Sequence, residues 1–373
     1  MTLILICTLL YVFIILGMIY GLMKMITKNK LISKSSSTKL ISVIIACKNE
    51  QDNIALLIDS LKKQSYHNYE VWLCDDHSTD QTATIIKENI IGDNRYHYVY
   101  IPSDFSTPYQ KKRKQDLKGK KKALSYGIDK SKGAILAFTD GDCLPGPEWL
   151  SDINNCFKNN LHNSFYAGYS PLIFPQANFV THLKNLEKAS IFAVCAGSFG
   201  LHIPITCTAR NIAYSKSLWE KVQGFNGIGH ILSGDDDLML LKMRKHIQNY
   251  FFSFHNTAII PTREKLDLQK QLHQDTRRGS KFIYYPLALQ SLILFITIYY
   301  LLILYNLWMK NFTFNFYLSL ILKINCEFIF IFIFLKKFNR LYYLKTFIIA
   351  ELLYIPYYLF FGIKGTFGKY HWK

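Results

Sequence analysis

The chain has 373 residues, of which 50% are hydrophobic and 15% aromatic, and it carries a formal net charge of +18. So apolar a composition excludes an intrinsically disordered chain, and the length excludes a small disulfide-stapled domain. The longest uncharged runs lie at the two ends, which indicates a membrane protein with a soluble middle. The 8 cysteines show no CxxC pair and no metal-ligand spacing, which favours a reducing compartment.

The first predicted element is an uncharged apolar run from Leu3 to about Met23. It is long enough to cross a hydrocarbon core of about 30 Å. Lysines follow it, beginning with Lys24 and Lys28, whereas a signal peptide carries its positive charge before the apolar stretch. The positive-inside rule therefore predicts an N-terminal transmembrane helix over residues 1–26, with the chain that follows in the cytoplasm.

Residues 38–272 alternate between short apolar runs and amphipathic stretches. Four runs rich in β-branched and aromatic residues are typical of strands: residues 40–47, 70–74, 97–101 and 134–139. Helical spacing separates them, most clearly in a stretch whose apolar residues are Ile54, Leu57, Ile58 and Leu61. This alternation predicts an α/β domain with a mostly parallel sheet, in which ligands bind beyond the carboxyl ends of the strands.

Acidic side chains cluster at those strand ends, although the chain as a whole is basic. They are Glu50 after the first strand, Asp75 and Asp76 after the second, and Asp140 and Asp142 after the fourth. Such a cluster repels itself unless it binds a cation or hydrogen-bond donors. Two carboxylates on either side of a glycine can present oxygens to one hard divalent ion whose other ligands are phosphate oxygens. The alternative is a turn in which aspartate is a local hydrogen-bond acceptor.

A run of basic residues lies between Lys111 and Lys122. Such runs are typical of contact with nucleic acid, but for a membrane-anchored domain anionic lipid head groups are the nearer partner. We therefore predict membrane lipids as partners and no nucleic acid. Lys120, which follows Gly119, is placed to approach a diphosphate, whereas most of the run is also compatible with a solvated loop.

A second acidic site consists of Asp235, Asp236 and Asp237. Three adjacent carboxylates favour proton uptake by one of them, which suits a general base. The alternative is the N-cap and first turn of a helix that begins near Leu238, because acidic residues stabilise the positive end of a helix dipole. The two interpretations are compatible with each other.

Apolar segments return in the C-terminal region, residues 282–373, which we predict to hold two or three transmembrane helices. The first two apolar runs cover about 282–308 and 316–335. The polar break between them is predicted to lie outside, and the basic stretch 336–340 to lie inside.

A third C-terminal run, residues 341–363, contains Lys345 and Glu351. It either crosses the membrane again or forms a hairpin or interfacial helix. Within the second run, Lys323 and Glu327 are four residues apart and so share one helix face. They either line a polar path or neutralise each other, because charged groups inside a membrane are costly.

Eight short motifs follow one another between about Leu40 and Lys281. They are Val43-Ile-Ile-Ala-Cys-Lys-Asn-Glu50, Asp75-Asp-His-Ser-Thr-Asp80, Gly119-Lys-Lys-Lys-Ala-Leu124, Thr139-Asp-Gly-Asp142, Ala209-Arg-Asn-Ile-Ala-Tyr214, Gly224-Phe225, Gly234-Asp-Asp-Asp-Leu238 and Gln274-Asp-Thr-Arg-Arg278. Each alone is a weak signal. Their order, with membrane segments on both sides, resembles the membrane-integrated family-2 glycosyltransferases, which are related to polysaccharide synthases. The resemblance implies an inverting enzyme with a GT-A fold.

The resemblance implies roles for the residues on the nucleotide side of the site. Glu50 and Asp75 or Asp76 would hold the nucleoside of a UDP- or GDP-sugar. Lys120 and Asp140 would lie near the nucleotide. Asp140 would also join Asp142 in holding Mg²⁺ or Mn²⁺ against the diphosphate.

The resemblance also implies a base and an acceptor side. Asp235 would deprotonate the acceptor hydroxyl, with Asp236 as the alternative, because the family's Glu-Asp pair is Gly-Asp here. Residues 273–281 resemble the QxxRW motif of processive synthases, in which Gln274 and Arg277 would lie at the diphosphate or acceptor. Arg278 replaces the tryptophan, so it either binds an acceptor phosphate or begins the cytoplasmic anchor of the next helix.

The leading hypothesis is a glycosyltransferase that moves a sugar from a nucleotide sugar to a lipid-linked or polysaccharide acceptor. The alternatives are a processive polysaccharide synthase and a non-catalytic membrane scaffold that retains a nucleotide-binding fold. The expected location is the bacterial inner membrane, with the catalytic domain in the cytoplasm.

Overall fold

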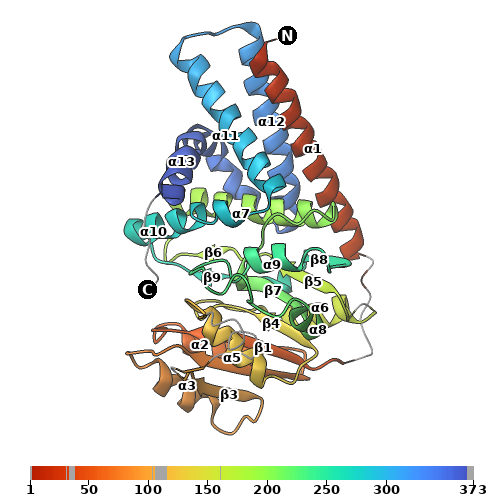
Figure 1. Cartoon of the computed structure of the whole chain (residues 1–373), viewed down its shortest axis with the longest axis vertical. Coiled ribbons are helices and arrows are strands. Elements are labelled where there is room, and N and C mark those ends of the chain that lie inside the picture. The colour runs from red at the N-terminus through yellow and green to blue at the C-terminus, as the bar shows by residue number, and fades with distance from the viewer. Residues whose placement is uncertain are drawn as a thin grey trace.

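The computed structural model describes residues 2–30, 32, 38–102, 104–105, 116–159 and 161–367. An α/β domain lies below a bundle of apolar helices (Figure 1). The first half of the predicted basic run, Lys111 to Lys114, lies outside the described residues.

A seven-stranded sheet is the base of the α/β domain. Its strands are β1 (Ile41–Cys47), β2 (Tyr69–Asp75), β3 (Tyr96–Tyr100), β4 (Ile135–Phe138), β5 (Ser164–Gly168), β7 (Ile212–Ser215) and β8 (Asn249–Ser253). They lie in the order β3-β2-β1-β4-β7-β5-β8, and of these strands only β7 runs antiparallel to its neighbours. The predicted mostly parallel sheet is therefore confirmed, and β1 to β4 occupy the four runs that the sequence indicates. A separate two-stranded sheet pairs β6 (Leu172–Ile173) with β9 (Thr262–Arg263).

Helices cover both faces of the sheet, because successive strand residues point to opposite sides. On one face Val43 and Ile45 pack in an apolar cluster with α2 (Ile54–Lys62), α3 (Thr82–Ile90) and α6 (Trp149–Phe157). On the other face Ile44 packs in a cluster with α5 (Lys121–Lys130), α8 (Lys216–Lys221) and α9 (Asp237–Met243). A strand buried on both faces is mostly apolar, as β1 is, and its one polar side chain, Ser42, donates a hydrogen bond to Glu70.

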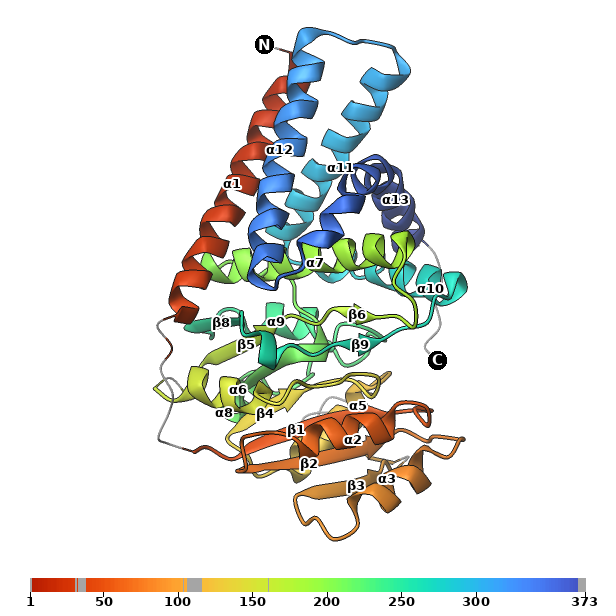
Figure 2. The same ribbon diagram turned by 180° about the vertical axis from the view of Figure 1, so that it is seen from behind.

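Helix α7 (Phe179–Gly200) lies between the sheet and the bundle (Figures 1 and 2). It crosses the N-terminal helix α1 (Leu3–Lys30) at small residues. A Cβ on Gly21 would clash with the carbonyl oxygen of Gly197, and one on Gly200 would clash with that of Gly21. Glycines are therefore required for the two helix backbones to touch, and this contact joins α1 to the helix that lies on the α/β domain.

Three helices form the upright part of the bundle: α1, α11 (Leu287–Trp308) and α12 (Phe314–Lys337). Each is long and apolar enough to cross a membrane. The chain turns between α11 and α12 at the end of the bundle that lies far from the sheet (Figure 1). These two helices match the first two C-terminal spans that the sequence predicts.

The third C-terminal segment returns before it reaches that far end. A short 3-10 helix, η4 (Leu341–Thr346), leads into α13 (Phe347–Phe367), and residues 341–366 together are apolar enough to span. The first turn of α13 packs on α12 through the Phe347 ring. Its last turns pack on α10 (Leu268–Gly279), where Gly365 approaches Gly279. Figure 2 shows α13 beside the lower half of the bundle, with its C-terminal end near α10, and Pro356 lies inside the helix. By length and composition this segment is one of 4 candidate membrane spans in the described part of the chain.

A buried ion cluster connects these helices. The ammonium of Lys323 is 2.9 Å from Glu327 and 2.6 Å from Glu351 of α13. Tyr11 of α1 donates a hydrogen bond of 2.6 Å to the other oxygen of Glu327. Lys323 is only 2% exposed, so its charge is paired inside the bundle with these two carboxylates.

Replacing Lys323 with Met should destabilise the bundle, because two neighbouring carboxylates lose their shared cation. Breaking a buried ion pair on one side typically costs about 3–5 kcal/mol. Unfolding of the detergent-solubilised chain measures the effect. Lys336→Met removes an exposed charge from the end of the same helix and should leave the stability unchanged. If both variants unfold like the unmodified chain, the ion cluster does not stabilise the bundle.

Candidate active site

The carboxyl ends of β1 and β2 bring three predicted residues to one edge of the sheet. Glu50 follows β1, and its Oε2 accepts a hydrogen bond of 3.0 Å from the Asn53 side chain. Asp75 ends β2 and is buried, where it accepts hydrogen bonds from the Ser78 amide and the Tyr98 hydroxyl, each 2.9 Å long. Asp76 is the next residue, and its amide donates to the last carbonyl of β1. These hydrogen bonds hold the acidic side chains in place at the edge where a nucleoside would bind.

The end of β4 brings the predicted metal residues beside Glu50. A Cβ on Gly141 would lie 2.7 Å from the Glu50 Cγ, so the glycine allows the two loops to touch. Arg210 lies near Asp142: burial alone would lower the pKa of its guanidinium, but the carboxylates of Asp142 and Asp140 raise it above its ordinary value. The Ala209-Arg-Asn motif is thereby placed at the same edge.

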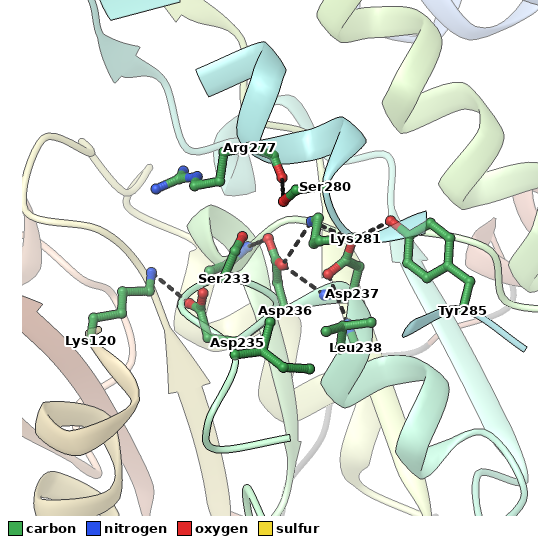
Figure 3. Close-up of polar contacts among 12 residues, drawn as sticks. Lys120, Ser233, Asp235, Asp236, Asp237, Leu238, Arg277, Ser280, Lys281 and Tyr285 are labelled. Atoms are coloured by element: carbon green, nitrogen blue, oxygen red, sulfur yellow. Dashed lines mark hydrogen bonds and ion pairs between the residues drawn. The ribbon is translucent and has the colours of Figure 1, made fainter. Parts of the chain in front are cut away.

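Lys120 joins the two acidic sites directly. Its ammonium is 2.8 Å from Asp140 Oδ1 and 2.8 Å from Asp235 Oδ2, and Figure 3 shows its contact with Asp235. Burial alone would lower the pKa of Lys120, but the two carboxylates raise it above its ordinary value. The structure therefore brings together three residues that come from three separate motifs.

The three aspartates before α9 have different surroundings. Asp236 is the N-cap of α9: one carboxylate oxygen accepts from the Asp237 amide and the other from the Ala209 amide. Asp237 is buried, and it is paired with Lys281 at 2.5 Å. Asp235 instead faces Lys120 and a small pocket at the ends of β4 and β7. Asp236 therefore caps the helix, and Asp235 is the residue that faces the site. The N-cap and the general-base interpretations of this acidic loop are compatible.

Lys281 ties the acidic loop to the membrane bundle, a role that the sequence did not indicate. Its ammonium and the Tyr285 hydroxyl both contact Asp237 Oδ2 (Figure 3). Burial alone would raise the pKa of Asp237, but Lys281 and the hydrogen bond from Tyr285 lower it below its ordinary value. The segment that enters α11 is thus fixed to the loop that carries Asp235.

Lys121 fixes the other side of the acidic loop, and the sequence placed it only in the basic run. Its buried ammonium donates hydrogen bonds of 2.5 Å to the Ile231 carbonyl and 2.6 Å to the Ser233 carbonyl. Burial lowers its pKa to about 8, although the nearby aspartates oppose the shift. The start of α5 is therefore held in place against the loop that precedes Asp235.

The residues of the QxxRW-like segment lie on α10. Arg278 donates to Glu187 of α7 at 3.2 Å and to Asp275 at 3.1 Å, so it belongs to an ion cluster between the two helices. Gln274 lines a shallow pocket together with Lys184 and Lys188 of α7. Arg277 extends from α10 on the side of Lys120 and Asp235 (Figure 3). Arg278 is thus paired away from the acidic site that Lys120, Asp140 and Asp235 form.

The donor set at the end of β4 suits a divalent cation that is shared with a phosphate ligand. In the described part of the chain no group of three or more His, Cys, Asp or Glu side chains could hold a metal ion. Asp140 and Asp142 are a pair, and Mg²⁺ commonly takes one or two carboxylates and completes its shell with phosphate oxygens and water. The hydroxyl of Thr139 is buried beside them with no hydrogen-bond partner. The residues present therefore fit a cation that arrives with a diphosphate.

Comparison with known proteins identifies the domain. Residues 42–169 match the family model of glycosyl transferase family 2. The glycosyltransferase AglE of Haloferax volcanii is 34% identical over 121 residues, which are 31% of this chain and 34% of that protein. An Escherichia coli UDP-Glc:alpha-D-GlcNAc-diphosphoundecaprenol beta-1,3-glucosyltransferase, WfaP, is 35% identical over 104 residues, 28% of this chain and 36% of that protein. Residues 42–169 are therefore a family-2 glycosyltransferase domain. The chain spans about a third of the length of these two curated relatives.

A solved structure shares the architecture of the whole chain. It is the mannosyltransferase PcManGT from Pyrobaculum calidifontis in complex with GDP-Man and Mn²⁺. The two structures align with a TM-score of 0.54 over 98% of each chain, at 14% sequence identity. The likeness confirms the predicted GT-A type of fold.

Proposed function

We propose that this chain is an inverting glycosyltransferase that moves a sugar from a UDP- or GDP-sugar to a lipid-linked or polysaccharide acceptor. The observation that carries the proposal is the convergence of Asp140 of the β4 edge and Asp235 of the α9 loop on the ammonium of Lys120. One end of this arrangement suits a leaving diphosphate, and the other end suits an activated hydroxyl.

Different residues on the donor side bind different parts of the nucleotide. Glu50 and Asp75 or Asp76 hold the nucleoside at the ends of β1 and β2. Asp140 and Asp142 hold Mg²⁺ or Mn²⁺, which when bound neutralises the charge of the leaving diphosphate. PcManGT, which was solved with GDP-Man and Mn²⁺, supports this class of donor and cation.

Asp235 is the base of the reaction. In a single displacement the acceptor oxygen attacks the anomeric carbon from the side opposite the diphosphate, and the carboxylate accepts the proton of the acceptor hydroxyl. The carbon–oxygen bond to the diphosphate breaks as the new bond forms, so the configuration at the anomeric carbon inverts. Asp236 is less suited, because both of its oxygens accept backbone hydrogen bonds.

The acceptor approaches from the membrane side, which is the cytoplasmic face of a bacterial inner membrane. Two observations support a lipid-linked acceptor: α7 and α10 lie between the acidic site and the bundle, and the relative WfaP is named for a diphosphoundecaprenol substrate. Short products are favoured over long polymers, because Arg278, in the position of the tryptophan, pairs with Glu187 and Asp275 and offers no aromatic surface to a growing glycan.

Mass spectrometry of reaction products tests the proposal. The purified chain is incubated with a panel of UDP- and GDP-sugars, a divalent cation and a native membrane lipid extract. We expect one donor to add one or very few sugar masses to a lipid acceptor. Long polymer would instead identify a processive synthase. If the protein binds no nucleotide and gives no product with any donor, the result favours a non-catalytic scaffold.

A further inference from the structure

One ammonium group occupies the space between the two acidic sites. The Lys120 side chain is 18% exposed and reaches Asp140 and Asp235 at the same distance, 2.8 Å. The distance between the two carboxylate oxygens is therefore no longer than these two contacts laid end to end. Without a cation between them, the two carboxylates would repel each other across this gap.

The gap is also the place where the donor must lie. In the proposed reaction the diphosphate and its cation contact Asp140, the acceptor hydroxyl contacts Asp235, and the sugar ring lies between them. Lys120 cannot span Asp140 and Asp235 while a sugar ring separates these two groups. Its side chain must therefore move when the donor binds.

The backbone beneath Lys120 is fixed, so the movement is confined to the side chain. The neighbouring Lys121 is held by the Ile231 and Ser233 carbonyls. Lys120 itself is the N-cap residue of α5, and its carbonyl accepts the Leu124 amide hydrogen bond. A flexible side chain on a fixed backbone can exchange one anionic partner for another without rearrangement of the fold.

We propose that the Lys120 side chain occupies the donor site until the donor binds, and that the divalent cation that accompanies the donor displaces it from Asp140. The proposal rests on the proposed function. Two cations cannot share one carboxylate without repulsion, so Lys120 and the metal ion compete for Asp140. The displaced ammonium then binds a phosphate oxygen of the donor, for which a lysine is suited as a point charge.

This exchange of partners by Lys120 sets the order of the steps in the reaction. While Lys120 is paired with Asp235, its ammonium lies 2.8 Å from the carboxylate oxygen that the acceptor hydroxyl would contact. Donor binding withdraws the ammonium and leaves Asp235 available to the acceptor hydroxyl. The donor therefore binds before the acceptor is activated.

Titration calorimetry with the full-length chain in detergent tests the competition. Three variants are compared with the unmodified chain: Lys120→Met removes the cation, Lys120→Arg keeps it, and Lys118→Met removes an exposed charge two residues away. Each is titrated with Mn²⁺ alone and with Mn²⁺ in the presence of UDP or GDP. Thermal unfolding checks that each variant is folded.

We expect Lys120→Met to bind Mn²⁺ alone about tenfold more tightly, or better, because a repelling charge next to Asp140 is gone. The same variant should bind nucleotide with Mn²⁺ more weakly, because a phosphate partner is lost. A purely structural role predicts losses in both titrations. Lys118→Met should resemble the unmodified chain, and Lys120→Arg, which keeps the positive charge, should show no gain in affinity for Mn²⁺ alone. Equal or weaker binding of Mn²⁺ alone by Lys120→Met would overturn the proposal.

A second measurement uses only the unmodified chain, should Lys120→Met not fold. Amine labelling followed by mass spectrometry should show that Mn²⁺ without nucleotide raises the reactivity of Lys120 and leaves Lys118 unchanged. Unchanged reactivity of Lys120, in protein that binds nucleotide with Mn²⁺, would refute the displacement and leave the proposed function standing. Absence of any binding of nucleotide with Mn²⁺ would contradict both.

Discussion

Replacing Asp235 with Asn should leave donor binding intact and lower sugar transfer by roughly 10²–10⁴-fold, the usual contribution of a general base. The amide keeps the shape of the carboxylate but cannot accept the proton of the acceptor hydroxyl. Transfer is measured as turnover of the nucleotide sugar with the lipid acceptor, and donor binding by calorimetry with Mn²⁺. Turnover close to that of the unmodified enzyme would exclude Asp235 as the base.

Asp236→Asn is the matched control for this variant. Asp236 accepts backbone hydrogen bonds from Asp237 and Ala209, so its substitution should lower the stability of the α9 loop more than it affects the chemistry. The unfolding temperature of both variants separates the two effects. A folded Asp236→Asn variant without activity, beside an active Asp235→Asn variant, would move the base to Asp236.

Replacing Asp142 with Ala should abolish metal-dependent binding of nucleotide and, with it, turnover. One of the two carboxylates offered to the cation is lost, and the described chain holds no larger group of ligands that would replace it. Calorimetry with UDP or GDP, with and without Mn²⁺, measures the loss. Equal nucleotide affinity in the variant and the unmodified chain, with Mn²⁺ present, would contradict the metal assignment.

Asp52→Ala controls for the general loss of negative charge at this edge of the sheet. The Asp52 side chain is 68% exposed, and its contact with Lys265 lies on the surface. The variant should bind nucleotide as the unmodified chain does. Asp142→Asn, which keeps a side chain beside Arg210, checks that the effect of Asp142→Ala does not arise from misfolding.

Local sequence pattern was sufficient for the first half of the sheet. Strand β1 is almost entirely apolar because both of its faces are buried, and α2 buries all four of its regularly spaced apolar residues. The acidic residues at the ends of β1, β2 and β4 meet because the carboxyl ends of neighbouring parallel strands share one edge. That rule predicts from the sequence alone that Glu50 and Asp140 lie at the same edge.

The second half of the domain was not predictable in this way. Strand β7 has four residues and runs antiparallel between β4 and β5, so neither its length nor its direction follows from the alternation of elements. Helix α7 is buried over much of its length between two apolar layers, and it therefore lacks a clear polar face that would mark it as a surface helix.

The contacts of the lysines depended on tertiary structure. Lys120 and Asp140 are 20 residues apart, and Asp235 lies far along the chain, so no spacing rule connects them. The sequence indicates no contact for Lys281, whose ammonium is buried against Asp237. Arg278 allowed two interpretations, and its pairing with Glu187 could arise only once α7 was in place.

The anomeric configuration of the product tests the central claim most directly. The purified enzyme is supplied with its nucleotide sugar and lipid acceptor, and the new linkage is examined by NMR spectroscopy. A single displacement with Asp235 as base predicts a linkage whose configuration is opposite to that of the donor. A linkage with the configuration of the donor would contradict the proposed mechanism.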